Sequence, residues 1–270
     1  KNPYTESESS YLFMTHPLLF SRADGIATLQ FNRPAQLNAL DVPTAQALLA
    51  AVQEIAADRS VRAVLLKGAG RAFVAGGDLA TLQANPVQGA QDLLEPLNAA
   101  VTLLHGLDAP VIAQVHGAAA GAGLSLMLMC DFVLAAEGTK FNLAYINLGT
   151  SCDVGASWAL PRLVGLRQAL EIALLGEGFD AAEALRLGLI NRVLPAAELD
   201  AAAQALAQRI ASGPTVAYGQ MRRLLRDSLT RDLPAQLQAE AQAFLACAKT
   251  PDFSEGVAAF LAKRPAQFAG

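Results

Sequence analysis

The sequence predicts an α/β fold followed by a helical C-terminal region. Short apolar runs at residues 63–67, 110–115 and 132–136 each end shortly before or at a glycine, as buried strands do. Helix-compatible sequence lies between or after these runs, and this alternation is typical of α/β proteins. After Gly165 the glycine turns become sparse and helical patterns dominate the rest of the chain.

Two further elements precede these strands. Residues 26–31 alternate between apolar and polar positions, which predicts a half-buried strand. Pro43 shortly after Asp41 is typical of a helix start, and apolar residues between Leu48 and Ile55 then recur on one helical face. In the C-terminal part, helices are predicted over residues 181–187, 199–211, 215–227, 233–248 and 253–263.

These patterns divide the chain into three parts. Residues 1–13 are largely polar, and we interpret them as a leader, with Met14 as the expected native start. Residues 14–200 form the predicted α/β core, and residues 201–270 form the predicted C-terminal helical region. No apolar run has the roughly 20 residues that a membrane-spanning helix needs, so no membrane partner is expected.

Composition limits the classes of partner. Hydrophobic residues make up 53% of the 270 residues and charged residues only 16%, so part of the apolar surface is expected to lie against partner subunits. The net charge is −4 and no basic cluster occurs, which argues against nucleic-acid binding. Cys130, Cys152 and Cys247 fit neither a disulfide framework nor a metal knuckle. A reducing, cytoplasmic compartment is therefore expected.

Two glycine-rich segments, residues 72–79 and 116–125, are candidate ligand-binding loops. Glycine lets a ligand approach the main chain, and a helix N-terminus adds N–H groups without partners. Together the segments could place two N–H donors around one developing oxyanion. For either segment alone, tight packing of a helix on the sheet is the better explanation. Neither segment matches a Walker loop or a dinucleotide fingerprint, which argues against nucleotide hydrolysis and hydride transfer.

Asp153 is the candidate acid–base residue. It stands alone among small and apolar residues, where burial would raise the pKa of its carboxyl group and let it transfer a proton at neutral pH. The alternative is an N-cap for a helix that starts near Val154, and from spacing alone the cap is at least as good an explanation. We interpret His105 and His116 as structural residues, and no cluster of ligands indicates a metal.

A series of spaced motifs runs in order from about Gly25 to Gly270. The motifs are Asn32-Arg33-Pro34, Leu37 to Leu40, Phe73 to Asp78, Pro110 to Ala113, Gly117 to Gly123, Cys130-Asp131, Arg162, Gly165 and Ala181 to Gly188. In these motifs the chain resembles the crotonase superfamily, also called the enoyl-CoA hydratase/isomerase family. The resemblance implies a crotonase-like spiral of ββα units with a C-terminal helical region, assembled as a homotrimer or a dimer of trimers.

The resemblance also implies a substrate and the residues that bind it. Members of the family bind an acyl-CoA thioester, so coenzyme A would be part of the substrate and no separate cofactor is expected. The oxyanion donors would be the backbone N–H groups of Gly77 and Ala122. The residues expected to contact the coenzyme A or the acyl group are Arg33, Ala39, Ala75, Asp78, Tyr145 and Lys263, the last from the final helix.

Departures from the family pattern bear on the reaction. Hydratases of the family use two glutamates to activate water, and these positions hold Ser125 and Tyr145 here. A two-glutamate hydration is therefore not expected. Asp153 matches the aspartate of the phenylacetate-pathway isomerases, which convert ring-1,2-epoxyphenylacetyl-CoA to oxepin-CoA and also shift double bonds between the 3- and 2-positions of enoyl-CoA chains. The resemblance thus implies an acyl-CoA isomerase in which Asp153 moves the proton.

The sequence leaves other functions open. A 4-chlorobenzoyl-CoA dehalogenase would use Asp153 as a nucleophile, and its histidine base is expected near Asn98. The only histidine in that region is His105, which is off the matching position. Enoyl-CoA hydration is a further alternative, as is a non-catalytic acyl-CoA- or RNA-binding member of the superfamily. The carboxylate at position 153 argues against a non-catalytic member.

Overall fold

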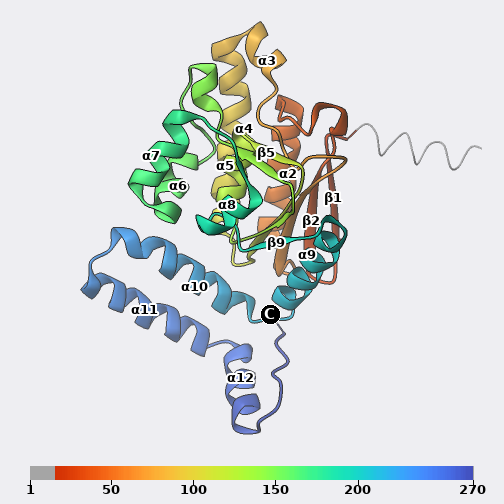
Figure 1. Cartoon of the computed structure of the whole chain (residues 1–270). Coiled ribbons are helices and arrows are strands. Elements are labelled where there is room, and N and C mark those ends of the chain that lie inside the picture. The colour runs from red at the N-terminus through yellow and green to blue at the C-terminus, as the bar shows by residue number, and fades with distance from the viewer. Residues whose placement is uncertain (1–15, 270) are drawn as a thin grey trace, which may run out of the picture.

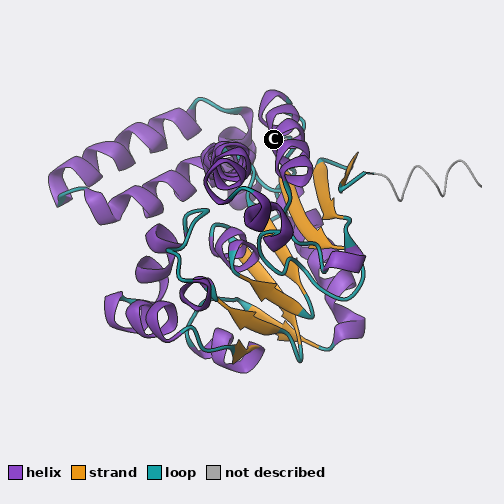
Figure 2. Ribbon diagram, turned by 90° about the horizontal axis from the view of Figure 1, so that it is seen from above, coloured by secondary structure: helices purple, strands orange, loops and turns teal. Residues whose placement is uncertain are grey.

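The computed structural model describes residues 16–269, and a six-stranded sheet lies at its centre (Figure 1 and Figure 2). In spatial order its strands are β1 (Leu18–Ala23), β2 (Ile26–Phe31), β3 (Ala63–Gly68), β4 (Val111–Val115), β6 (Phe132–Ala136) and β9 (Arg192–Leu194). Only the β1–β2 pair of this sheet is antiparallel. A second sheet contains β5 (Ala118–Ala120), β7 (Lys140–Asn142) and β8 (Phe179–Asp180). The leader predicted over residues 1–13 lies outside the described residues.

Helices connect and cover the strands. Between β2 and β6 lie η1 (Pro34–Gln36), α2 (Val42–Ala57), α3 (Leu79–Ala84), α4 (Pro86–Gly106) and α5 (Ala122–Leu128). After β7 come η2 (Tyr145–Leu148), α6 (Ala156–Val164), α7 (Leu166–Leu175) and α8 (Ala181–Arg186). The C-terminal part consists of α9 (Ala196–Ala211), α10 (Thr215–Asp227), η3 (Ser228–Thr230), α11 (Leu233–Ala248) and α12 (Pro251–Leu261).

The predicted α/β class and the helical C-terminal part are confirmed. The four strands expected from the sequence are present as β2, β3, β4 and β6, and the five expected C-terminal helices are α8 to α12. The helix start near Pro43 is also correct, because Asp41 caps α2 by accepting a hydrogen bond from the Thr44 N–H at 2.9 Å.

The sequence interpretation missed β1, which forms a hairpin with β2. The turn has only two residues, Asp24 and Gly25, with φ angles of 52° and 75°. Asp-Gly between two β-like runs is a strong signal for a tight hairpin turn, because both central residues need a positive φ. That signal was present in the sequence. The short strands β5, β7, β8 and β9 carry no comparable local signal.

Side chains alternate across the central sheet, so its two faces contact different helices. On one face, Val64 and Leu66 of β3 belong to the larger core, together with residues of α2, α4 and α5. On the other face, Leu65 packs with Leu199 and Ala203 of α9. The domain boundary predicted at residue 200 falls inside α9, and the division into two domains stays a prediction.

Beyond α9, the helices α10 to α12 extend away from the sheet (Figure 1). A buried ionic cluster holds α10 in place. Oδ1 of Asp131 lies 2.9 Å from Nε of Arg222 and 2.8 Å from a guanidinium nitrogen of Arg226. Oδ2 of the same Asp131 accepts a hydrogen bond from the Val111 N–H at 2.7 Å, and Arg222 also donates to the Ala109 carbonyl. The cluster therefore fastens α10 to the start of β4.

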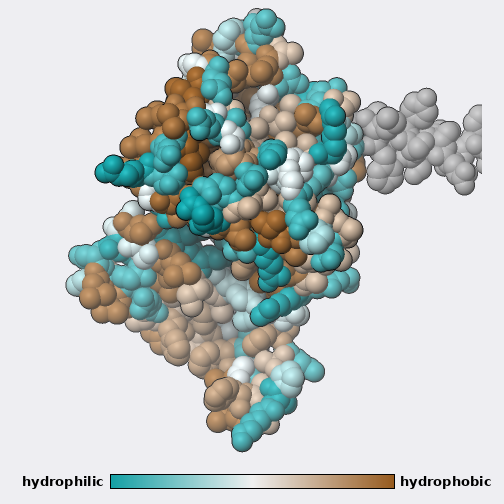
Figure 3. Space-filling view, viewed as in Figure 1, coloured by the Kyte–Doolittle hydropathy of each residue, from teal (hydrophilic) through white to brown (hydrophobic). Residues whose placement is uncertain are grey.

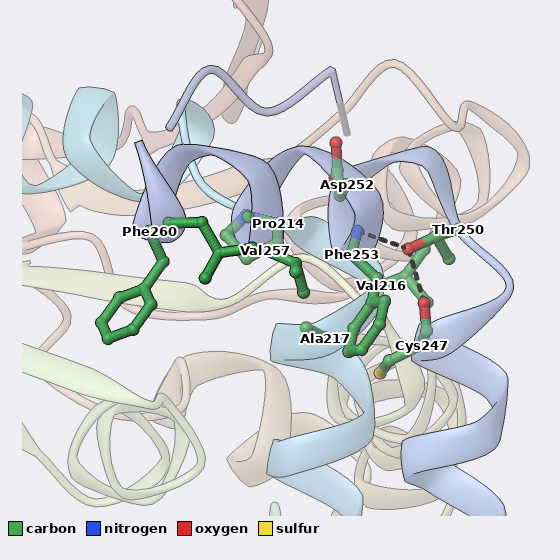
Figure 4. A pocket seen from close by; sticks show the side chains of 11 residues that line it. Pro214, Val216, Ala217, Cys247, Thr250, Asp252, Phe253, Val257 and Phe260 are labelled. Atoms are coloured by element: carbon green, nitrogen blue, oxygen red, sulfur yellow. Dashed lines mark hydrogen bonds between the residues drawn. The ribbon is translucent and has the colours of Figure 1, made fainter. Parts of the chain in front are cut away.

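Apolar side chains are exposed on α7 and on the C-terminal helices. Leu166, Leu170 and Leu174 are spaced by four residues and share one face of α7, and Figure 3 shows apolar side chains gathered in this region. Between α10, α11 and α12 lies an apolar pocket of about 380 Å³, with Val257 and Phe260 in its wall (Figure 4). Exposed apolar faces of this kind are typical of surfaces that become covered by another molecule.

We predict that the ionic cluster carries a large part of the stability of this attachment. Replacing Arg222 by Met leaves the buried Asp131 carboxylate with one cation fewer, and breaking such a pair destabilises a protein by about 3 kcal/mol or more. The neighbouring Arg223 makes an exposed pair with Asp108, so Arg223→Met is a matched control with an expected loss of less than about 1 kcal/mol. Urea unfolding of both variants measures the difference. Equal losses would contradict the prediction.

Candidate active site

The two predicted glycine-rich segments lie side by side in the fold. The Ala120 N–H donates a hydrogen bond to the Val74 carbonyl oxygen at 3.0 Å, which joins the segments as a short parallel bridge. One residue further, a Cβ built on Gly121 would lie 3.5 Å from the Cα of Gly76. The segments expected to supply the two oxyanion donors are therefore in backbone contact.

Both predicted oxyanion donors, Gly77 and Ala122, have an N–H group that is available to a ligand. Gly77 forms a parallel bridge with Leu40, and the hydrogen bonds of this bridge are made by Gly76 and Asp78 on either side of it. The N–H of Gly77 itself therefore points away from Leu40. Ala122 is the first residue of α5, and the first N–H groups of a helix have no partner within it. Among the described residues, neither N–H donates a hydrogen bond.

Close packing explains other glycines of the second segment. A Cβ at Gly123 would lie 2.1 Å from the Val74 carbonyl oxygen, and one at Gly117 would lie 1.9 Å from the Arg71 carbonyl oxygen. Gly121 itself has φ of 48° and ψ of −124°, a conformation that side chains disfavour. The packing explanation is thus correct for part of the second segment, residues 116–125. It does not compete with ligand binding, because packing is what places the free N–H groups.

The two donors open into one cavity of about 390 Å³. Its wall is mostly small or apolar, and Asp153 is the only charged side chain among the residues that line it. The lining residues are Ala75, Gly76, Gly77, Leu79, Leu82, Ala90, Leu93, Leu94, Gly121, Ala122, Ala144, Tyr145, Asn147, Leu148, Thr150, Ser151, Cys152 and Asp153. Ala75 and Tyr145, which we predicted as substrate contacts, are therefore at this cavity.

Asp153 belongs to a small group of buried polar side chains. The Tyr145 hydroxyl donates a hydrogen bond to Oδ1 of Asp153 and lies 2.9 Å from Oγ of Ser125. Burial raises the pKa of the Asp153 carboxyl group above its ordinary range, and the hydrogen bond from Tyr145 opposes part of this shift. Burial and the nearby Asp153 charge also raise the pKa of the Tyr145 phenol. Tyr145 is therefore a neutral donor here, and Asp153 is the group that can exchange a proton.

The alternative interpretation of Asp153 as a helix cap is wrong. Helix α6 begins at Ala156, and its N-cap is Gly155, which has a φ of 87° and no side chain to bond the helix. Only the backbone carbonyl of Asp153 contacts the helix, by accepting from the Ala156 N–H at 3.1 Å. The side chain of Asp153 is directed to Tyr145 instead, so its carboxylate is not consumed by a structural role at the helix terminus.

Three of the residues predicted to contact coenzyme A bind one another. Arg33 donates to the Ala39 carbonyl oxygen at 2.5 Å and forms an ion pair with Asp78 at 2.9 Å. Asp41 lies 3.2 Å from the same guanidinium group. Asp78 sits in the chain between Gly77 and the cavity-lining Leu79, so this cluster braces the first glycine-rich segment. A contact with coenzyme A by Arg33, Ala39 or Asp78 stays a prediction.

Two other candidates lie away from the cavity within this chain. Lys263 is not part of the final helix, because α12 ends at Leu261 and Lys263 follows in a turn with a φ of 53°. Figure 1 shows α12 and α3 at opposite ends of the molecule, so Lys263 does not approach the cavity that Leu79 lines. His105 lies at the C-terminal end of α4, where its ring packs edge-on against Trp158 at 5.3 Å between centroids.

Burial dominates the environment of His105, with Arg226 and Arg222 nearby, and together they lower the pKa of its imidazole. These contacts agree with a structural role. Within residues 16–269 there is no group of His, Cys, Asp and Glu side chains that could hold a metal ion. The described helices also include none that is long and apolar enough to cross a membrane.

The model of the enoyl-CoA hydratase/isomerase family matches residues 21–270. The chain belongs to this family. The 1,2-epoxyphenylacetyl-CoA isomerase of Escherichia coli (strain K12) is 38% identical over 250 residues, which are 91% of this chain and 95% of that protein. The crotonyl-CoA hydratase of Syntrophomonas wolfei is 33% identical, with 93% and 97% of the two chains covered.

Among solved structures, an enoyl-CoA hydratase of Mycobacterium smegmatis has a TM-score of 0.88 and 35% identity, with 94% of this chain and 99% of that chain covered. The crotonase-type fold predicted from the motifs is thereby confirmed. The relatives carry hydratase, isomerase and dehalogenase names, so the names do not fix the reaction of this enoyl-CoA hydratase/isomerase family member. The roles of its individual residues stay predictions.

We predict that Gly123 sets the geometry of the Ala122 donor. In Gly123→Ala the new methyl group would collide with the Val74 carbonyl oxygen, so α5 must move, and overpacking of this kind destabilises a protein by about 1–3 kcal/mol. Binding of an acyl-CoA should weaken as well, because the two N–H donors separate. Gly106→Ala is the control, since nothing lies within 4 Å of its Cβ and alanine favours a helix. Calorimetric titration measures the affinity for acyl-CoA, and thermal unfolding measures the stability. Equal values for Gly123→Ala and Gly106→Ala would contradict the prediction.

Proposed function

We propose that this family member is an acyl-CoA isomerase that moves a proton through an enolate held by Gly77 and Ala122. The observation that carries the proposal is that Asp153 is the single carboxylate in the wall of the cavity that both N–H groups line. One carboxylate with a raised pKa suits a reaction that removes a proton from one carbon and returns it to another. We propose a 1,2-epoxyphenylacetyl-CoA or a 3-enoyl-CoA as the substrate.

A 3-enoyl-CoA would be isomerised by two proton transfers, both through Asp153. Asp153 takes a proton from the carbon next to the thioester carbonyl, and the electron pair moves onto the carbonyl oxygen to give a dienolate. The N–H groups of Gly77 and Ala122 stabilise that oxygen, since donors that are already oriented need no rearrangement as the charge develops. Asp153 then returns the proton to the fourth carbon, and the double bond lies between carbons two and three. The carboxylate is regenerated without any co-reactant.

The residues of the cavity give little support to hydration. Water activation by a pair of carboxylates needs a second acid, but Ser125 and Tyr145 hold hydroxyl groups at the positions implied for the glutamates. The two hydroxyls already bond each other, and the Tyr145 hydroxyl also donates to Asp153. We therefore propose that hydration is at most a side reaction.

Dehalogenation is the second candidate, because it would use Asp153 in the same cavity as a nucleophile. It also requires a general base that activates water. His105 is not among the residues that line the cavity, and its ring contacts Trp158 instead. Thus no histidine among the described residues lines the cavity to activate the water that would cleave the aryl ester, which favours the isomerase.

We also propose that the protein assembles as a homotrimer or a dimer of trimers. The exposed apolar faces of α7 and of α10 to α12 support this, because a monomer would leave them in water. Lys263 would then serve the cavity of a neighbouring subunit rather than its own. A reducing, cytoplasmic location agrees with three free cysteines. We propose no separate cofactor and no nucleic-acid partner.

The proposal is tested by a panel of coenzyme A thioesters carrying 3-enoyl, ring-epoxide, crotonyl and 4-chlorobenzoyl groups. Isomerisation of the first or second should exceed hydration of crotonyl-CoA, which is expected at trace level. Asp153→Asn should then lose isomerisation by roughly 10²–10⁴-fold while it still binds acyl-CoA, because the amide fills the same space but cannot take a proton.

Asp180→Asn is the matched control. Asp180 caps α8 outside the cavity, and asparagine is an equally good cap, so turnover and stability should stay near those of the unaltered protein. A near-normal turnover of Asp153→Asn would contradict the proton-transfer role. Crotonyl-CoA hydration as fast as isomerisation would remove the main reason to prefer an isomerase.

Isotope labelling separates the isomerase from the dehalogenase. Turnover of an enoyl-CoA in D₂O should place deuterium on the acyl chain to the extent that the proton on Asp153 exchanges with solvent before its return. Turnover in H₂¹⁸O should leave Asp153 unlabelled, because a proton shuttle forms no bond to carbon. A nucleophilic Asp153 would form an aryl ester that water cleaves, which places ¹⁸O in the side chain. Chloride release from 4-chlorobenzoyl-CoA with ¹⁸O in Asp153 would overturn the isomerase.

A further inference from the structure

A chain of hydrogen bonds leads from Asp153 back to one of the oxyanion donors. The Tyr145 hydroxyl donates to Asp153, the Ser125 hydroxyl lies 2.9 Å from the Tyr145 oxygen, and Oγ of Ser125 lies 3.1 Å from the Gly121 carbonyl oxygen. The Gly121 carbonyl and the Ala122 N–H belong to the same peptide group. The chain therefore begins at the proton acceptor and ends on the peptide whose N–H lines the cavity.

This chain of hydrogen bonds contains two hydroxyl protons, and its hydroxyl groups can donate in either of two directions. When Asp153 is ionised it is the strongest acceptor, because hydrogen bonds to a charged oxygen are the stronger ones. Tyr145 then donates to Asp153, and Ser125 turns its single proton to the Tyr145 oxygen. In this direction the Gly121 carbonyl receives only the backbone N–H of Ser125, at 3.0 Å.

Protonation of Asp153 favours the opposite direction. A neutral carboxyl group is a weaker acceptor, so Tyr145 can donate to Ser125, and Ser125 can donate to the Gly121 carbonyl oxygen at 3.1 Å. An added donor on a carbonyl withdraws electron density from its peptide group and strengthens the N–H of that group as a donor. The N–H concerned is that of Ala122.

The surroundings of the chain make this difference matter. Ser125 is fully buried and Tyr145 is 9% exposed, so water competes little with these bonds. Besides Asp153, the titratable side chains that line the cavity are Tyr145 and Cys152, and no Lys, Arg, His or Glu lines it. The cavity therefore has no fixed charge from α3, α4 or α5 that would force the hydrogen bonds to keep one donor direction.

We propose that Ser125 and Tyr145 are positioning residues that couple the protonation of Asp153 to the donor strength of the Ala122 N–H. The inference rests on the proposed isomerase function, in which Asp153 gains its proton in the step that creates the oxyanion. The stronger donor would thus appear when the negative charge does. By linkage, an oxyanion at Ala122 favours the protonated form of Asp153 to the same extent.

The coupling can be measured without turnover. Butanoyl-CoA carrying ¹³C at its thioester carbonyl has no double bond to move, and isotope-edited infrared difference spectroscopy reports how strongly the bound carbonyl is polarised. In the unaltered protein the carbonyl band should move to lower frequency as the pH falls and Asp153 takes up its proton. This shift should shrink by about half or more in Ser125→Ala and in Tyr145→Phe. The Ser125 side chain makes no hydrogen bond to Asp153, so its replacement leaves the carboxyl group in place.

Thr139→Val is the matched control, because it also removes a fully buried hydroxyl, one that donates to the Ala136 carbonyl away from the cavity. It should leave the pH-dependent shift unchanged. If the band shifts as much in Ser125→Ala and Tyr145→Phe as in the unaltered protein, the proposed hydrogen-bond relay from Asp153 to the Ala122 peptide is overturned. The electric field of Asp153 alone would then explain the shift. A band that does not respond to pH in the unaltered protein would also overturn the relay.

Turnover supplies a second readout. For the best thioester of the panel, Ser125→Ala and Tyr145→Phe should each lower kcat by about tenfold with little change in KM, and the double variant should be no worse than either single one. Independent roles would instead multiply to about a hundredfold, which would overturn the relay. A pH-dependent carbonyl shift in a protein that isomerises no thioester would sink the proposed function and leave the relay standing.

Discussion

The backbone contact between the two glycine-rich segments is the constraint on which the rest of this structure depends. A Cβ at Gly123 has no room against the Val74 carbonyl, and the same carbonyl accepts a hydrogen bond from the Ala120 N–H at 3.0 Å. An oxyanion hole needs donors that are fixed before the charge develops. For the predicted donors Gly77 and Ala122, the fixing would come from close packing of main chain on main chain, which at Gly123 only glycine permits.

A second constraint is the burial of polar groups with few partners. Ser125 lies on α5, Tyr145 in η2 and Asp153 in the loop before α6, and Tyr145 is the partner that both of the others share. Buried polar groups that are left without partners are strongly destabilising, so the three side chains hold one another in place. Their arrangement leaves a carboxyl group whose pKa is raised by burial, and that is the property a proton shuttle requires.

The sequence was informative wherever the signal is local. The alternation at β2, the cap at Asp41 and the apolar runs of β3, β4 and β6 each depend on neighbouring residues, and all four strands and the helix are present. The Asp24-Gly25 turn was an equally local signal, and its omission hid β1. By contrast β5, β7, β8 and β9 have only two or three residues each, and they are strands because a distant neighbour pairs with them.

The sequence by itself determined the family, the two glycine-rich segments in which the oxyanion donors are expected, and the absence of glutamates at positions 125 and 145. Only the tertiary structure excluded the helix-cap interpretation of Asp153, because α6 begins later with Gly155 as its N-cap and the Asp153 carboxylate instead accepts a hydrogen bond from Tyr145. It also separated His105 and Lys263 from the cavity. The physical reason is that the direction of a side chain and its burial depend on how the loops fold back on one another, even over the eight positions from Tyr145 to Asp153, and no periodic pattern records this.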